Sequence, residues 1–220
     1  MQRFLRDNGL SITLFALFLI SIVGQAVAGW RAQIEELRIH GQPALGFFDY
    51  LTTGHFISAT FENWESEFLQ MSVYVLLTVY LFQKGSAESK KPGEPNAEDE
   101  PPHLKRSDPD APWPVHRGGL VLKLYSHSLS IALVSLFVVS FWLHLAGSTQ
   151  RSNEEALRHG RPPQTMVETL ADAEFWYESF QNWQSEFLSI AVLIVLGIFL
   201  RERGSPESKP VAAPHHVTGH

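Results

Sequence analysis

The strongest constraint on the fold of this chain is a pair of long apolar runs that carry no charge. One run reads "LSITLFALFLISIVGQAVAGW" at residues 10–30, and the other extends from about Ser126 to Gly147. A helix needs about 20 mostly apolar residues to cross the hydrocarbon core of a bilayer. Both runs reach that length, so the sequence predicts membrane-spanning helices. The alternative, two buried helices of a 220-residue soluble protein, is disfavoured because so small a globule hides such runs poorly.

Two shorter apolar blocks complete a four-span pattern. Residues 68–82 and 187–200 reach span length only if each includes the preceding turn or two, which reads NWxSEF both times. We therefore expect an all-α membrane protein with four transmembrane helices. On this prediction the two NWxSEF stretches lie at a membrane boundary or just inside it.

The same pattern of residues occurs twice, at a constant offset of 119 positions. "NWESEFL" at 63–69 matches "NWQSEFL" at 182–188, and "HGQP" at 40–43 matches "HGRP" at 159–162. "GSAESK" at 85–90 likewise matches "GSPESK" at 204–209. A register kept over about 85 residues indicates a duplication. We expect two tandem parallel hairpin repeats, related by a pseudo-two-fold axis along the membrane normal.

Repeat and composition together divide the chain into four parts. We predict a first two-span hairpin at 1–84, a disordered linker at 85–116, a second hairpin at 117–203 and a disordered tail at 204–220. The linker is rich in Pro, Glu, Asp, Lys and Ser, and such a segment buries too little apolar area to offset its chain entropy. Amphipathic helices are expected in the two outer loops, where Thr165 and Glu168 have the spacing of a capping box.

The basic residues predict the orientation. Most Lys and Arg residues lie in the N-terminus, the linker and the tail, so these segments are expected on the cytoplasmic side. Arg3, Arg6, the first apolar run and "AVA" at 26–28 also resemble a cleavable signal peptide. That alternative is disfavoured, because the same segment has a counterpart in the middle of the chain.

Composition excludes several classes of site. There are no cysteines, so disulfides, thiolate metal sites and redox dithiols are absent from the sequence. The net charge is −6 and no basic stripe is visible, so no nucleic-acid partner is predicted. Gly-rich phosphate loops and HExxH stretches are also missing.

The paired "ENWESEF" and "QNWQSEF", together with the repeated "EE" and "HGxP", resemble an uncharacterised family of bacterial four-helix integral membrane proteins, a domain of unknown function. The resemblance covers most of the chain apart from linker and tail. It implies a bacterial origin and a place in the inner (cytoplasmic) membrane, with several spans. It implies no activity, cofactor or site residues.

The first candidate site is polar and belongs to the repeated motif. Asn63 with Glu67, and Asn182 with Glu186, are i, i+4 pairs at the start of two predicted spans. A polar stripe on a span faces the bundle interior, and two-fold symmetry would bring the two carboxyl groups together to hold a proton or a cation. Alternatively, both carboxylates lie at the headgroup level and only fix the helices.

A second, weaker candidate is a metal site in the outer loops. Glu36 with His40, and Glu155 with His159, are i, i+4 pairs that could bind a divalent metal if the loops meet. The favoured interpretation is a helix stop, since each His is followed by Gly and then by Pro two residues later. No cofactor is predicted otherwise.

Three functions remain open on this sequence. The first and favoured is a non-enzymatic membrane scaffold or accessory protein, in contact with the lipid bilayer and with a homo-oligomeric or other membrane protein partner. The second is a small proton or cation transporter or channel that uses Glu67 and Glu186. The third is a metal-binding membrane enzyme that uses the outer Glu and His pairs.

Overall fold

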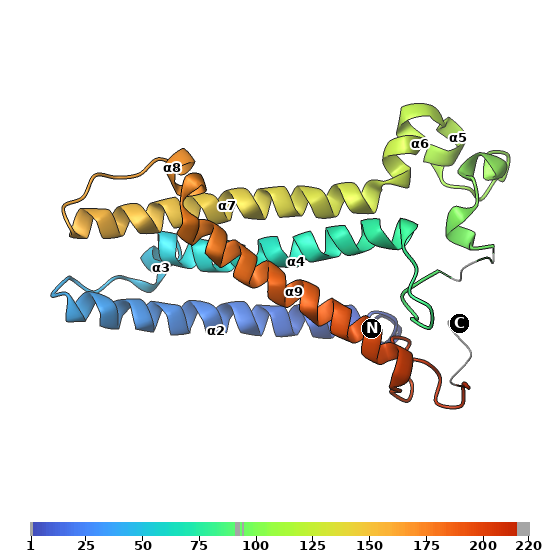
Figure 1. Ribbon diagram of the computed structural model, residues 1–220, viewed down its shortest axis with the longest axis horizontal. Coiled ribbons are helices and arrows are strands. Elements are labelled where there is room, and N and C mark those ends of the chain that lie inside the picture. The colour runs from blue at the N-terminus through green and yellow to red at the C-terminus, as the bar shows by residue number, and fades with distance from the viewer. Residues whose placement is uncertain (1, 91–92, 94, 215–220) are drawn as a thin grey trace. The chain divides into compact units, whose positions relative to one another are not determined.

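The computed structural model describes residues 2–90, 93 and 95–214, and within them the fold is entirely helical (Figure 1). Long helices alternate with short ones, and two 3₁₀ helices lie in the linker. The helices are α1 (Gln2–Asp7), α2 (Gly9–Ile39), α3 (Phe47–Tyr50), α4 (Gly54–Tyr80), η1 (Ala97–Asp99), η2 (Pro102–Lys105), α5 (Trp113–Arg117), α6 (Gly119–Ser126), α7 (Ser128–Arg158), α8 (Met166–Ala171) and α9 (Ala173–Phe199).

Three of the described helices are long and apolar enough to cross a membrane, judged by length and composition: α2, α7 and α9. These helices agree with a multi-pass membrane protein. The predicted second span corresponds to α4, which is not among the three. Its first half carries the polar NWxSEF stretch, and Gln70 and Ser72 interrupt its apolar second half.

The contacts of the chain divide it into two compact units. Unit 1 comprises Met1–Phe61 and Leu143–Asp172, and unit 2 comprises Glu62–Trp142 and Ala173–His220.

In unit 1, both helices that precede an HGxP motif end in the same way. After α2, Gly41 has a φ of 67°, and the amides of Gly41 and Gln42 donate to the carbonyls of Arg38 (3.1 Å) and Leu37 (2.8 Å). After α7, Gly160 has a φ of 64°, and the Gly160 and Arg161 amides donate to Leu157 (3.3 Å) and Ala156 (2.8 Å). These bonds form the Schellman motif, which satisfies the last carbonyls of a helix. The predicted helix stops at both motifs are therefore confirmed.

The start of α4 and the end of α7 approach each other closely through small residues in unit 1. The Ser58 and Ser148 hydroxyls lie 2.8 Å apart, and both side chains are buried. A Cβ added at Gly147 would lie 2.5 Å from the Ser58 amide nitrogen. A Cβ at Gly54 would collide with the Arg151 backbone nitrogen. Small side chains are what allow two helix backbones to come this near.

The short helix α3 packs on α2 in unit 1. Tyr50 is 1% exposed, and its hydroxyl lies 3.0 Å from His55 Nδ1. That hydroxyl lies so close to the Cα of Gly29 that an added Cβ would collide with it. Burial raises the pKa of Tyr50. Trp30 donates from Nε1 to the Leu45 carbonyl at 2.8 Å, which ties the loop before α3 to α2.

The capping box predicted in the second outer loop is confirmed at the start of α8. The Glu168 amide donates to the Thr165 hydroxyl at 3.3 Å, and the Thr165 amide donates to Glu168 Oε2 at 2.7 Å. The buried Thr169 hydroxyl accepts from the Thr149 hydroxyl at 3.0 Å. This contact packs α8 against α7 within unit 1.

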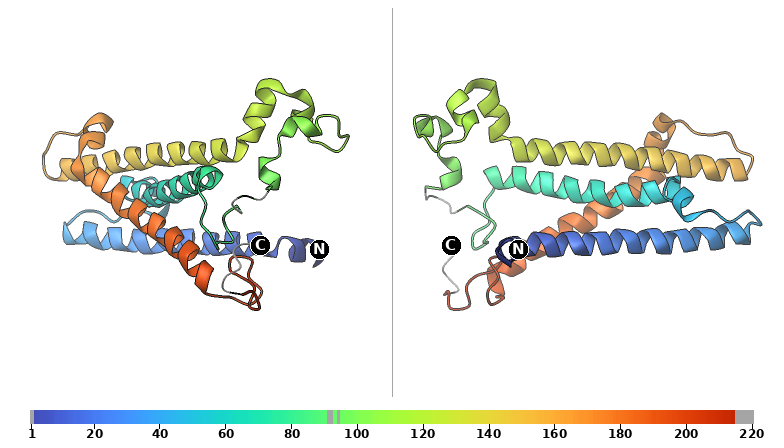
Figure 2. Two further views of the ribbon diagram at one scale, coloured as in Figure 1. Left: turned by 45° about the vertical axis from the view of Figure 1, so that its right-hand side comes forward. Right: turned by 180° about the vertical axis from the view of Figure 1, so that it is seen from behind.

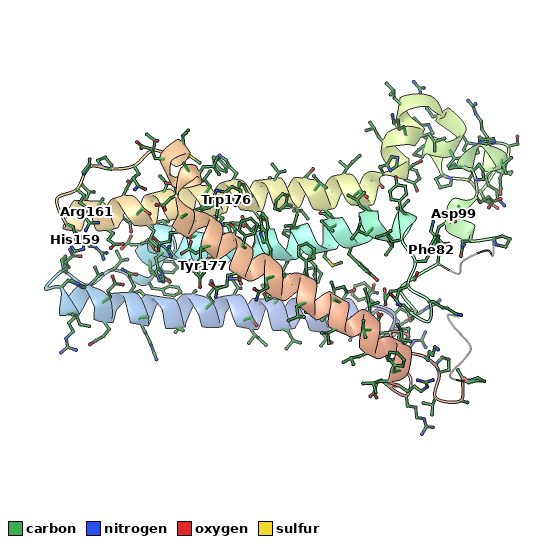
Figure 3. The ribbon with its side chains drawn as sticks, in the orientation of Figure 1. Phe82, Asp99, His159, Arg161, Trp176 and Tyr177 are labelled. Atoms are coloured by element: carbon green, nitrogen blue, oxygen red, sulfur yellow. The ribbon has the colours of Figure 1, made fainter. Side chains whose placement is uncertain are left out.

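Unit 2 is built around aromatic contacts between α7 and α9. Phe141 of α7 contacts Phe175 and Trp176 of α9, with ring centroids 5.6 and 6.1 Å apart. The aromatic contacts continue along α9, where the ring centroids of Trp176, labelled in Figure 3, and Trp183 lie 6.3 Å apart. Before α7 the chain turns sharply at His127, so that α6 points away from the axis of α7 (Figures 1 and 2).

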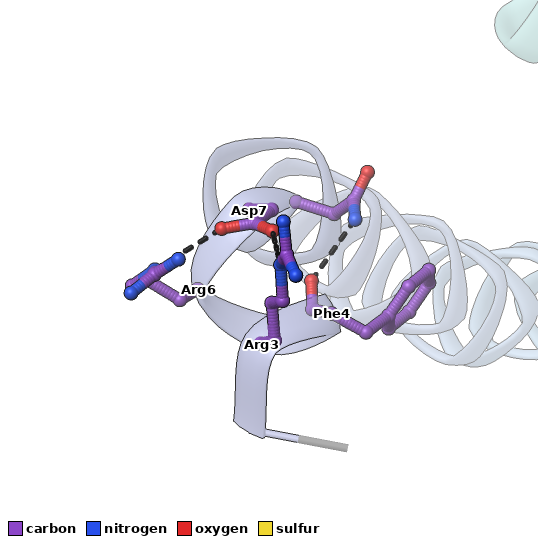
Figure 4. A network of polar contacts seen from close by, with 5 residues as sticks. Arg3, Phe4, Arg6 and Asp7 are labelled. Atoms are coloured by element: carbon purple, nitrogen blue, oxygen red, sulfur yellow. Dashed lines mark hydrogen bonds and ion pairs between the residues drawn. The ribbon is translucent and has the colours of Figure 1, made fainter.

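The linker holds only short elements in its described part. The helices η1 and η2 and most of α5 fall within the segment predicted to be disordered, and disorder there stays a prediction. At the N-terminus, Asp7 lies 3.5 Å from Arg3 and 3.1 Å from Arg6, so one carboxylate interacts with both guanidinium groups (Figure 4).

Candidate functional site: a polar seam between α4 and α9

Polar side chains line the face along which α4 and α9 pack in unit 2. They recur every three or four residues on each helix, which places them on one side of it. We call this set the polar seam. It consists of Glu62, Glu65, Ser66 and Gln70 on α4, and Glu178, Ser179, Asn182, Trp183, Glu186 and Ser189 on α9.

Glu65 is fully buried in the seam. Its side chain is 0% exposed, and its Oε1 accepts a hydrogen bond from Trp183 Nε1 at 3.3 Å. The next residue, Ser66, is 1% exposed and donates to the Asn63 carbonyl at 2.7 Å. The bond from Trp183 of α9 therefore satisfies a carboxyl oxygen of α4 that water does not reach.

Two more carboxyl groups, those of Glu62 and Glu178, lie close together, and Glu62 is about one helical turn before Glu65. Asn182 donates from Nδ2 to Glu62 Oε1 and also, at 3.1 Å, to the backbone carbonyl of Glu178. One carboxylate oxygen of Glu62 lies within 4.8 Å of one of Glu178. Both side chains are half-buried. Asn182 therefore links the side chain of Glu62 on α4 to the backbone of α9.

At the end of the seam that contains Gln70 and Ser189, a side-chain amide joins α4 to α9. Gln70, which is 7% exposed, donates from Nε2 to the Glu186 carbonyl at 2.7 Å and to the Ser189 hydroxyl at 3.4 Å. Ser189 in turn donates to the Glu186 carbonyl at 2.8 Å. Because a helix carbonyl is fixed in space, these bonds set the register of α4 against α9.

One hydroxyl of the seam has no hydrogen-bond partner. Ser179 is 0% exposed, and its Oγ makes no hydrogen bond. It follows Glu178 and lies one turn before Asn182 and Trp183, which contact Glu62 and Glu65. Buried polar atoms are nearly always paired, so the Ser179 hydroxyl is an exception within the seam.

The residues predicted from the NWxSEF motif lie in different places. Asn182 and Glu186 are half-buried members of the seam, whereas Asn63 and Glu67 are exposed. The charge of Glu67 still acts on Glu186 electrostatically. The structure thus brings together the predicted residues of α9 with residues of α4 that the repeated motif does not predict, above all Glu62 and Glu65.

The predicted outer Glu and His pairs are engaged in other contacts. His40 Nδ1 lies 2.8 Å from the Glu36 carbonyl, as expected for a side chain that caps the end of α2. The Glu36 carboxylate accepts from Arg158 at 3.1 Å. His159 is exposed where α7 ends (Figure 3). Among the described residues, no group of three potential metal ligands includes Glu36, His40, Glu155 or His159.

Comparison with known proteins yields one match. A family model described as a domain of unknown function (DUF6766) matches residues 1–220. No curated protein and no solved structure matches the chain.

Proposed function

Because the chain belongs to this family of unknown function over its whole length, we propose a role from its geometry: a multi-pass membrane protein that binds a proton or small cation in the polar seam. The observation that carries the proposal is the complete burial of Glu65 on a helix that packs against a candidate membrane span. Ionisable groups inside membrane segments are costly and mark proton or ion pathways.

The neighbours of Glu65 support a binding role over a purely structural one. A structural hydrogen bond needs one acceptor, yet Glu62 and Glu178 add two further carboxyl groups within 4.8 Å of each other. Asn182 bonds Glu62 but cannot neutralise it, because an amide carries no charge. Ser179, on the same face of α9, adds a buried hydroxyl that makes no hydrogen bond.

The proposed architecture is that of two tandem hairpins with four spans, α2 and α4 in the first and α7 and α9 in the second. Matching contacts support it. Ser66 donates to the Asn63 carbonyl at 2.7 Å, and Ser185, 119 positions later, donates to Asn182 at 2.8 Å. Gln70 and Ser189, which are equivalent positions, contact each other. Contact between equivalent residues is what a two-fold axis between α4 and α9 would produce.

In this proposal α4 crosses the membrane with its polar residues turned toward α9. The seam satisfies groups that lipid could not, which explains how a helix less apolar than the others can still span. The distribution of Lys and Arg supports cytoplasmic termini and linker, and the bacterial inner membrane is the proposed location.

Ion flux into proteoliposomes tests the function. Glu65→Gln keeps the size of the side chain and its bond to Trp183 but removes the charge, so we expect proton or cation flux to fall at least about tenfold, within the range for loss of an essential proton-transfer group. Glu62→Gln should act in the same direction. Glu67→Gln is the matched control on the exposed side of α4 and should keep most of the flux.

The alternative is a scaffold or accessory protein, and the same experiment separates the two. Folded parent protein that supports no flux of protons or of monovalent or divalent cations, and that binds none of them, would refute the proposal. The seam would then serve only to join α4 to α9.

A further inference from the structure

The chain turns back on itself directly after α9, which is a candidate membrane span. The Glu202 amide donates to the Ser208 hydroxyl at 2.9 Å, and the Glu207 amide donates to the Ser205 hydroxyl at 3.2 Å. A Cβ added at Gly197 would lie 3.2 Å from the Glu207 carbonyl oxygen, so this segment runs back beside the last turns of α9. We call residues 202–208 the return loop.

A groove lies between the return loop and α9 within unit 2. Its volume is about 490 Å³, which falls in the range of small-molecule binding sites. The wall formed by α9 and the residues just beyond it is apolar and includes Val192, Leu193, Leu196 and Leu200, each between 44% and 58% exposed. A bilayer surrounds the outward face of a span with acyl chains, so an acyl chain is the natural neighbour of this wall.

The end of the groove at the return loop carries a positive charge. Arg201 lines it, donating from Nη1 to the Phe199 carbonyl at 2.7 Å and from Nη2 to the Ala213 carbonyl at 3.4 Å. Backbone carbonyls carry no net charge, and no carboxylate in the described part of the chain forms an ion pair with Arg201. A guanidinium group has five N–H donors, so Arg201 retains its charge and further donors for an anion.

Two carboxylates lie at the same end of the groove. Glu202 and Glu207 are exposed and line the groove together with Arg201. A purely anionic headgroup would face Arg201 but would be repelled by both carboxylates. A headgroup with a phosphate and an ammonium group matches all three side chains, because guanidinium binds phosphate and an ammonium group donates to carboxylates.

The equivalent loop after α4 provides a comparison within the same chain. It has the same two backbone-to-serine hydrogen bonds, at 2.9 and 3.1 Å, and it borders a groove of about 350 Å³. Phe82 lines that groove at the position equivalent to Arg201, and its described lining includes no Lys or Arg. The two loops therefore share a backbone shape, but only the return loop lies beside a cation at the end of an apolar groove.

We propose that the groove between α9 and the return loop binds one phospholipid whose headgroup carries both a phosphate and a primary ammonium group, as in phosphatidylethanolamine. Arg201 and the Ser205 hydroxyl donate to the phosphate, and Glu202 and Glu207 accept from the ammonium group. One acyl chain lies along the apolar wall of α9. This site rests on α9 crossing the membrane and does not depend on cation binding in the polar seam.

Lipid binding to the full-length protein in detergent tests the site. Native mass spectrometry compares phosphatidylethanolamine, phosphatidylglycerol and phosphatidylcholine with identical acyl chains. Phosphatidylglycerol lacks the ammonium group, and the methylated ammonium group of phosphatidylcholine has no N–H donors. We expect phosphatidylethanolamine to bind about tenfold more tightly than either, the effect of one charge-assisted hydrogen bond.

Two matched arginines make the test specific. Arg201→Gln removes the positive charge from the groove, so phosphatidylethanolamine should bind about tenfold more weakly. Arg203→Gln is the control, because Arg203 is exposed nearby but does not line the groove, and it should leave binding unchanged. Glu202→Gln combined with Glu207→Gln should remove the preference for phosphatidylethanolamine over phosphatidylglycerol.

Three results would overturn the proposal. The parent protein could bind the three lipids equally, or it could prefer phosphatidylglycerol, which would indicate a simple basic anchor. The third is an equal loss of binding in Arg201→Gln and Arg203→Gln, which would show that the lipid does not occupy the groove. The comparison of lipids on the parent protein holds whether or not each variant folds.

Discussion

Only glycine fits at position 147, because a Cβ atom there would collide with α4. The nearest atoms to an added Cβ are the backbone nitrogen and Cα of Ser58, at 2.5 and 2.9 Å, and the Ile57 side chain. A clash with backbone atoms cannot be relieved by a rotamer change, as a clash with a flexible side chain can. The buried bond between Ser58 and Ser148 depends on the same approach, so the two helix segments would have to separate to admit a methyl group.

We predict that Gly147→Ala destabilises the protein by about 1–3 kcal/mol, the usual cost of overpacking. The free energy of unfolding in detergent micelles measures it. Gly24→Ala is the matched control, because nothing lies within 4 Å of a Cβ added there. In a helix interior that change should stabilise by about 0.5–1 kcal/mol. Equal effects of the two substitutions would contradict the close approach at Gly147.

At the same scale, the sequence shows why the seam was only partly predicted. The NWxSEF motif predicts a site at Asn63 and Glu67 because both residues recur in the second copy, as Asn182 and Glu186. Glu65 is two residues from Glu67, which is more than half a turn around a helix, and it is Glu65 that is buried. The spacing of Glu62, Glu65, Ser66 and Gln70 was a signal for this face, but only the partner helix decides which of two polar faces is covered.

At the scale of the element, local chemistry was enough to predict how several helices begin and end. The stops at His40 and His159 need only Gly at a positive φ, and the capping box needs only Thr165 and Glu168. That α2, α7 and α9 are candidate spans follows from their length and apolar composition. Apolar length alone could not predict whether α4 crosses a membrane. Its polar residues are tolerated in a span only where α9 supplies their hydrogen-bond partners.

The capping box gives α8 a pH dependence of its own. Hydrogen bonds from the Thr165 amide and hydroxyl lower the pKa of Glu168. A carboxyl with a lowered pKa contributes stability above its unfolded value, about 4.3, and loses that contribution as the pH falls through the folded value. We predict that the hydrogen-exchange protection of the Thr165 amide decreases on acidification.

Amide exchange by NMR, expressed as protection relative to the unstructured chain, measures this change. In Glu168→Gln the acceptor remains but does not titrate, so the protection should no longer respond to acid. Protection of Thr165 that is constant in the parent protein across the carboxyl range would show that the Glu168 bond does not hold the start of α8.

At the scale of the molecule, the question is whether α4 crosses the membrane. Four spans place the linker on the side opposite both outer loops, whereas a chain without a span at α4 leaves the linker on the side of the first outer loop. Single cysteines in this cysteine-free chain distinguish the two cases.

We predict that an impermeant maleimide labels Ala44→Cys and Arg161→Cys in intact cells with a permeabilised outer membrane. Asp108→Cys and Val211→Cys should be labelled only after lysis, because the positive-inside rule predicts a cytoplasmic place for the basic segments. Labelling of Asp108→Cys before lysis, together with Ala44→Cys, would show that α4 does not span.

The bond from Gln70 to the carbonyl of Glu186 has a consequence for how the two halves of the chain can diverge. Every amino acid presents the same carbonyl, so any residue at 186 accepts this bond. The alignment of the two helices should thus survive random substitution at 186 far better than substitution at 70, where the amide itself is needed. The side chain at 186 can therefore change during evolution while the register of α4 against α9 stays the same.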